Sequence, residues 1–208
     1  MPVIDINDRL CINNWKQLHD NGYFSKHPHY TGYKLDADEI AQYLILECEL
    51  TQEDEVLEIG CGYGRIMYAL ADHVKSIVGI DLHEVPIRQA EIILKDKPNA
   101  YTYLCDGDSI PLNDACITFV YAMSAMQHMP RSIVHKYVAE CTRVLKPGGR
   151  VCLHFLDKDS GGNDDIKANM RGEQSVGWTV AEVENLAEVF TSWNVYQSGK
   201  SIYLKGHK

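Results

Sequence analysis

The run Val56-Leu57-Glu58-Ile59-Gly60-Cys61-Gly62-Tyr63-Gly64-Arg65 places a short apolar strand directly before three closely spaced glycines. Glycine adopts the positive φ angles of a tight turn, and its lack of a side chain lets backbone N–H groups approach a ligand closely. A helix that starts here directs its positive end at the same place. By itself the loop does not identify a ligand, because a plain β–α turn or another kind of nucleotide-binding loop has the same glycines.

Outward from this loop, short apolar strands alternate with amphipathic helices. Strands are predicted at 56–59, 76–80, 101–104, 117–121 and 150–155, and helices at 36–49, 65–72, 84–95 and 131–144. After a polar stretch and a helix near 180–190, the runs 193–197 and 201–205 flank a Ser198-Gly199-Lys200 turn, which is a hairpin signal. The sequence therefore predicts an α/β fold: a doubly wound, mostly parallel, seven-stranded Rossmann-like sheet with a C-terminal antiparallel hairpin.

Composition and charge narrow the class of protein. The 208 residues suit one compact domain, because 45% are hydrophobic and 24% charged. The net charge of −9 repels the phosphate backbone of a nucleic acid, so we expect no nucleic-acid partner. The apolar stretches are too short to span a bilayer, so we expect no membrane partner. The first residues lack a basic start and an apolar core, and the seven cysteines form no Cys-x-x-Cys pair. We expect a cytoplasmic monomer or homodimer with reduced thiols.

Acidic residues follow the next two predicted strands. Asp81 comes 17 residues after Gly64, and a carboxylate at that place can accept both hydroxyls of a ribose. A helix N-cap is the alternative role for Asp81, because aspartate is favoured there. Asp106 follows the third strand, where a carboxylate can accept the exocyclic amine of adenine or simply belong to a polar turn.

Four motifs together resemble one family. VLEIGCGYGR, VGIDL, CDGDSIPL and LKPGGRV, in this order and spacing, resemble the class I S-adenosylmethionine-dependent methyltransferases over about residues 50–156. The resemblance implies the cofactor S-adenosyl-L-methionine and a methyltransferase domain at 36–208, preceded by an N-terminal helix and cover segment at 1–35. Leu112, in place of a large aromatic residue, and Cys116-Ile117-Thr118, in place of Ser-Phe-Asp, depart from the pattern but concern packing at the fourth strand.

The resemblance also implies which loops contact the cofactor. The glycine-rich loop holds its methionine part, the loop after the second strand its ribose, and the loop after the third strand its adenine. The segment 121–128, after the fourth strand, faces the methyl group. The cofactor-binding residues implied in this way are Glu58, Gly60, Cys61, Gly62, Asp81, Leu82, Asp106, Gly107, Asp108 and Met123.

A methyl group on a sulfonium is already electrophilic, so the protein mainly positions the nucleophile and excludes water. A general base is needed only when the nucleophile arrives protonated. His128 is the first candidate for this base, because an unperturbed imidazole pKa of about 6.5 suits proton transfer near neutrality. Its alternative role is to cap or pack the following helix. His154 on the fifth strand is the second candidate, and Tyr30 and Tyr33 are weaker ones.

The aromatic segment 22–33 precedes the predicted domain and contains Tyr23, Tyr30 and Tyr33. We hypothesise that it covers the cofactor, because aromatic faces attract cations such as a sulfonium. Packing of these tyrosines onto the core is the alternative. We predict no metal site, since His27 and His29 have no carboxylate or cysteine partner nearby in the sequence.

The predicted activity is methyl transfer to an N or O atom of a small-molecule acceptor. Three alternatives stay open: a protein side chain as the acceptor, a non-catalytic cofactor-binding subunit, and a nicotinamide oxidoreductase. The Gly-x-Gly-x-Gly spacing and the predicted hairpin argue against the oxidoreductase, whose fingerprint is Gly-x-Gly-x-x-Gly. A non-catalytic subunit can carry identical loops, so only turnover separates it from an enzyme.

Overall fold

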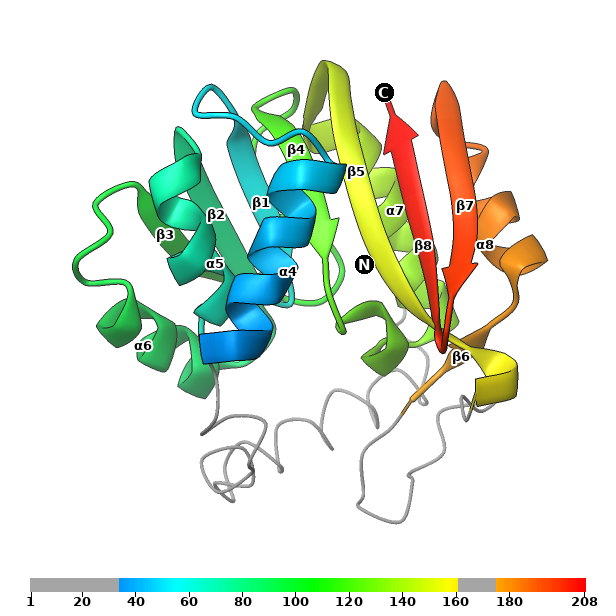
Figure 1. The fold of residues 1–208 in the computed structure, drawn as a ribbon, viewed down its shortest axis with the longest axis horizontal. Helices are drawn as coiled ribbons and strands as arrows, with labels where there is room; N and C mark the ends of the chain where they lie inside the picture. Colours follow the sequence, from blue (N-terminus) through cyan, green and yellow to red (C-terminus); the bar gives the residue numbers. More distant parts are fainter. Residues whose placement is uncertain (1–33, 161–174) are drawn as a thin grey trace.

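The computed structural model describes residues 34–160 and 175–208. Within these residues one sheet has the strand order β3-β2-β1-β4-β5-β8-β7, and the short strand β6 pairs with β5 (Figure 1). The strands are β1 (Glu55–Ile59), β2 (Ser76–Asp81), β3 (Ala100–Leu104), β4 (Ile117–Ala122), β5 (Leu145–Asp157), β6 (Gly177–Trp178), β7 (Ser192–Ser198) and β8 (Ser201–His207).

The sheet has a parallel part and an antiparallel end. Strands β1 to β5 are mutually parallel, whereas β8 runs antiparallel to β5 and β7 antiparallel to β8. Gly199, with a φ of 59°, takes the first position of the two-residue turn between β7 and β8, as a type II′ turn requires. The predicted fold class is confirmed. The predicted strand count omitted β6, because two residues are too few to show an alternating pattern.

Helices cover both faces of the sheet. The helices are α4 (Lys34–Glu47), α5 (Arg65–Leu70), α6 (Glu84–Ile93), α7 (Arg131–Val144) and α8 (Val180–Ala187). Figure 1 shows α4 and α5 in front of the sheet and α7 behind it. Because neighbouring strand residues point to opposite faces, Phe119 and Tyr121 pack in the cluster with α4 and α5, whereas Val120 packs with α7.

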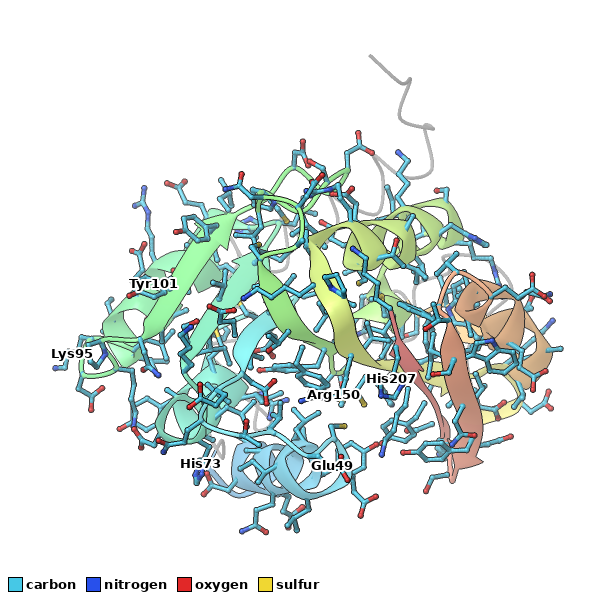
Figure 2. All side chains as sticks on the ribbon, turned by 90° about the horizontal axis from the view of Figure 1, so that it is seen from above. Glu49, His73, Lys95, Tyr101, Arg150 and His207 are labelled. Atoms are coloured by element: carbon cyan, nitrogen blue, oxygen red, sulfur yellow. The ribbon has the colours of Figure 1, made fainter. Side chains whose placement is uncertain are left out.

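The two edges of the sheet differ in chemistry. Figure 2 looks onto the edge where the parallel strands begin, and Arg150 lies there. The Arg150 guanidinium bonds both carboxylate oxygens of buried Asp54 at 3.1 Å, and the Thr118 hydroxyl donates to Asp54 at 2.8 Å. This network joins the start of β1 to β4 and β5. The opposite edge, where the strands end, carries the loops predicted to bind the cofactor.

Candidate active site

The three glycines after β1 all have left-handed backbones, with φ angles of 72° at Gly60, 52° at Gly62 and 75° at Gly64. A Cβ atom on Gly60 would lie 2.6 Å from the Cβ of Ala125, in the loop after β4. Gly60 therefore lets these two loops touch. Their contact lies between β1 and β4, where the strand order reverses, and ligands of open α/β sheets bind at such a point.

The backbone N–H groups of the glycine-rich loop bind within the chain. Those of Gly60 and Cys61 donate to the Ile80 carbonyl at 2.9 and 3.0 Å, and that of Gly62 donates to the Asp81 carboxylate at 2.9 Å. Helix α5, which follows, has only six residues. The loop consequently offers a ligand a bare, closely approachable backbone surface on which the N–H groups of Gly60, Cys61 and Gly62 already have partners within the chain.

Asp81 lies half-buried at the end of β2, and its two carboxylate oxygens accept the N–H groups of Gly62 and His83 at 2.9 and 3.0 Å. Burial raises the pKa of the Asp81 carboxyl, although these two donors oppose the shift. The N-cap of α6 is His83, whose Nδ1 accepts the Val85 N–H at 3.2 Å. The capping alternative for Asp81 is thus wrong, and ribose binding stays a prediction.

Glu58 lies below the loop, only 2% exposed, and accepts a hydrogen bond from the Tyr121 hydroxyl at 2.8 Å. Burial raises the pKa of the Glu58 carboxyl to about 8, against the opposing effects of the Tyr121 bond and the Arg65 charge. The carboxyl is therefore mostly protonated at neutral pH until a cation approaches. Sequence reasoning missed Tyr121 as its partner, although the two residues are register neighbours in β1 and β4.

Cys61 packs inside the loop. A Cβ atom on Gly79 would lie 2.7 Å from the Cβ of Cys61, so the absence of a side chain in β2 makes room for this thiol. Burial raises the pKa of the Cys61 thiol well above its usual value, which makes the thiol chemically inert. The contribution of Cys61 to cofactor binding stays a prediction.

The loop after β3 forms a turn around Asp106. One of its carboxylate oxygens accepts the N–H groups of Asp108 and Ser109 at 2.9 and 3.1 Å, and the bond from Asp108 is the main cause of its lowered pKa. Asp106 is exposed, Gly107 has a φ of 83°, and Asp108 pairs with Lys136 of α7. The adenine contacts of Asp106, Gly107 and Asp108 stay predictions, as does that of half-buried Leu82.

The loop after β4 carries the segment predicted to face the methyl group. Met123 is buried, whereas Ser124 is exposed and has a left-handed φ of 57°. His128 ends a short 3₁₀ helix (Met126–His128), and its Nε2 lies 3.3 Å from the side-chain nitrogen of Gln127. His128 is half-buried at the predicted edge, and its role as a base stays a prediction.

His154 lies in β5, only 9% exposed. Its Nδ1 accepts the Ser124 N–H at 3.2 Å, and its Nε2 lies 2.8 Å from the Ser201 hydroxyl. Burial, and then the nearby His128, lower the pKa of His154 to about 4, so the ring is neutral at physiological pH. Both ring nitrogens have partners inside the chain, a feature that the sequence pattern did not reveal.

The structure thus brings the loops after β1, β2, β3 and β4 together at one edge. Tyr23, Tyr30 and Tyr33, with His27 and His29, lie outside the described residues. Among residues 34–160 and 175–208, no three His, Cys, Asp or Glu side chains are grouped so that they could hold a metal ion. No helix in the same ranges is long and apolar enough to cross a membrane.

The family model and two curated relatives that match this chain are described as methyltransferases. Residues 56–149 match the family described as "Methyltransferase domain". The chain is 27% identical over 186 residues to sterol 4-C-methyltransferase of Caenorhabditis elegans, covering 80% of this chain and 54% of that protein. It is also 27% identical over 105 residues to ubiquinone biosynthesis O-methyltransferase of Coxiella burnetii, covering 50% of this chain and 44% of that protein. The chain therefore spans about half the length of these curated relatives.

A solved structure shares the whole architecture. The 1,6-didemethyltoxoflavin-N1-methyltransferase of Burkholderia thailandensis superposes with a TM-score of 0.76 and 15% identity, covering 100% of this chain and 92% of that one. At this identity the match shows the fold. By their names, the three similar proteins methylate carbon, oxygen and nitrogen, so similarity alone does not identify the acceptor atom.

Proposed function

We propose that this chain, which belongs to the class I S-adenosylmethionine-dependent methyltransferases, transfers a methyl group from S-adenosylmethionine to an N or O atom of a small-molecule acceptor. The main observation is the junction at which Gly60 contacts Ala125, with Asp81 bonded to the same glycine-rich loop. This junction lies at the strand-order reversal and within the residues that match the methyltransferase domain.

The cofactor supplies an electrophilic methyl group, and the residues at this edge fit its parts. A carboxylate has about four acceptor sites, and the backbone N–H groups of Gly62, Leu82 and His83 do not use all of them, which leaves acceptor capacity for ribose hydroxyls. Exposed Asp106 suits the adenine amine, and buried Glu58 suits the cationic amino group of the methionine part. The bare backbone at Gly60 and Gly62 allows the close approach that such a ligand needs.

In this proposal the methyl acceptor binds beside the loop after β4, next to the end of β5. Ser124 is exposed directly after Met123, and half-buried His128 follows in the same loop. His128 is the base in this proposal, receiving a proton from a hydroxyl or ammonium acceptor. A small acceptor is supported by the names of the curated relatives, a sterol methyltransferase and a ubiquinone biosynthesis methyltransferase.

The test is a screen of small amines, hydroxyl compounds and thiols with methyl-labelled cofactor, read as label in the acceptor and release of S-adenosylhomocysteine. We expect label on nitrogen or oxygen of at least one small acceptor. Label only in an added protein fraction would replace the small acceptor by a protein side chain. Cofactor binding without turnover on any acceptor, peptides included, would favour a non-catalytic subunit.

A further inference from the structure

Ser124 has a backbone conformation that its own chemistry disfavours. Three non-glycine residues of the described ranges have positive φ angles, namely Glu49, Ala115 and Ser124. Ser124, at 57°, is the one that lies two residues after the end of β4, at the edge where the cofactor loops meet. A Cβ atom makes this conformation unfavourable, and the exposed Ser124 side chain cannot fix it by packing. The burial of Met123 and Ala125 on either side fixes the chain path, and a contact to the Ser124 backbone itself adds to this.

His154 makes such a contact. Its Nδ1 accepts the Ser124 N–H at 3.2 Å, which requires an unprotonated Nδ1 and therefore a proton on Nε2. The Nε2–H then donates to the Ser201 hydroxyl at 2.8 Å. The result is a chain of hydrogen bonds from β8 through β5 to the loop after β4, three strands that lie side by side in Figure 1.

The surroundings of His154 keep this arrangement fixed. The ring is buried and tilted against the Tyr203 ring, with 5.2 Å between centroids. Protonation of Nδ1 would remove the acceptor for the Ser124 N–H and place a charge close to His128. Burial, and then His128, oppose this protonation by lowering the pKa of His154 to about 4. Proton abstraction from a substrate, in contrast, requires a lone pair that is not already used.

We propose that His154 is a positioning residue for methyl transfer, whose Nδ1 holds Ser124 in the left-handed conformation that directs the start of the loop after β4 toward the acceptor. This inference rests on the proposed function, because the acceptor-facing role of the loop comes from it. It assigns His154 a structural task at the site in place of the proton transfer considered from the sequence.

The first test needs no acceptor. In the wild type, ¹⁵N NMR of His154 should show the Nε2–H tautomer with no titration between about pH 5.5 and 8, the range in which an ordinary histidine titrates. His154→Leu removes the acceptor, and we expect the Ser124 amide to exchange with solvent about tenfold faster or more. His154→Asn offers an oxygen near the former Nδ1 and should restore most of the protection.

Ser201→Ala is the milder companion variant. It leaves His154 in place and removes only the partner of Nε2–H, so Ser124 exchange should rise by a few-fold. An Nδ1–H tautomer, a His154 that titrates near its ordinary pKa, or unchanged Ser124 exchange in His154→Leu would each overturn the proposal.

The second test separates positioning from proton transfer. Glycine adopts a left-handed backbone without a Cβ penalty, so Ser124→Gly should make the loop independent of His154. With an acceptor from the screen, we expect His154→Leu to lower kcat about tenfold or more, and the double variant with Ser124→Gly to recover most of it. A base would behave differently: neither Ser124→Gly nor His154→Asn could replace it.

The two proposals can fail separately. A screen without turnover contradicts the proposed function but leaves the tautomer and the amide exchange measurable. Turnover in the wild type, combined with no rescue of His154→Leu by Ser124→Gly, contradicts the positioning role alone.

Discussion

The loop after β1 and the loop after β4 meet where Gly60 contacts Ala125, yet they are built differently. The first uses glycine at its left-handed positions and is bonded to the adjacent strand β2. The second places a serine in that conformation and holds it with His154, 30 positions away in the sequence. The cofactor side is thus specified by local residues, and the acceptor side by a long-range contact.

The largest effect should come from breaking the contact between the two loops. Gly60→Ala places a Cβ atom 2.6 Å from Ala125 and should abolish cofactor binding measured by calorimetry. Gly148→Ala is the matched control: Gly148 also has a positive φ, of 76°, a Cβ atom there meets nothing within 4 Å, and the residue lies in β5 near Arg150, away from the cofactor loops. We expect it to weaken binding by less than about tenfold, from backbone strain alone. Equal losses in both variants would contradict the importance of the loop contact.

A second change acts on the cofactor side only. Asp81→Ala removes acceptors for two ribose hydroxyls, each bond contributing about 1.5–3 kcal/mol, and also frees the Gly62 N–H. We expect S-adenosylmethionine affinity to fall by about 10²-fold or more, with a smaller loss in Asp81→Asn. Unchanged affinity in a folded Asp81→Ala protein would disprove the ribose assignment.

His128→Asn acts on the acceptor side. If His128 accepts the proton, kcat should fall by about 10²-fold and the acid limb of the pH–rate profile should disappear, because general bases contribute about 10²–10⁴-fold. Cofactor affinity should stay within a few-fold of the wild type, since Asp81 and the glycine-rich loop are untouched. A variant with wild-type kcat and the same acid limb would show that His128 is not the base.

The last change acts on the stability of the chain rather than on binding or turnover, and concerns Glu58 without cofactor. Its pKa is about 8 in the folded chain against 4.5 for the ordinary side chain, so the folded state binds the proton more tightly. The resulting stability is complete below about pH 4.5 and is lost as pH rises toward 8, by at most about 1.4 kcal/mol per pH unit. Thermal melts should show Tm falling more steeply over this range in the wild type than in Glu58→Gln. Parallel curves would contradict the raised pKa.

Local residues made most of the fold predictable. The glycine-rich loop, the short apolar strands and the Gly199 turn each carry their own signal. Ten helix or strand starts fall within one residue of prediction: Glu55, Arg65, Ser76, Glu84, Ala100, Ile117, Arg131, Val180, Ser192 and Ser201. β5 begins at Leu145 rather than 150, because Leu145 pairs with Ile117 ahead of an irregularity in the ladder. Gly148, with a left-handed φ of 76°, lies within this irregular part of the strand.

The site was less predictable where long-range contacts shape it. The Tyr121 hydroxyl reaches Glu58 over 63 positions, and Ser201 reaches His154 over 47. Neither pair has a sequence signature. The left-handed Ser124 has none either, since serine, unlike glycine, gives no hint of a positive φ. The division of the chain at residue 35 and the cover at 22–33 stay predictions, because residues 1–33 lie outside the described residues.

The most direct test of the account is chemical-shift mapping of the ¹⁵N-labelled chain titrated with S-adenosylhomocysteine. We expect the largest shifts at the amides of Gly62, Leu82 and Gly107, and at the start of the loop after β4. The amides near Asp54 and Arg150, at the opposite edge of the sheet, should stay unchanged. No binding, or shifts centred on that opposite edge, would contradict the placement of the cofactor and with it the proposed function.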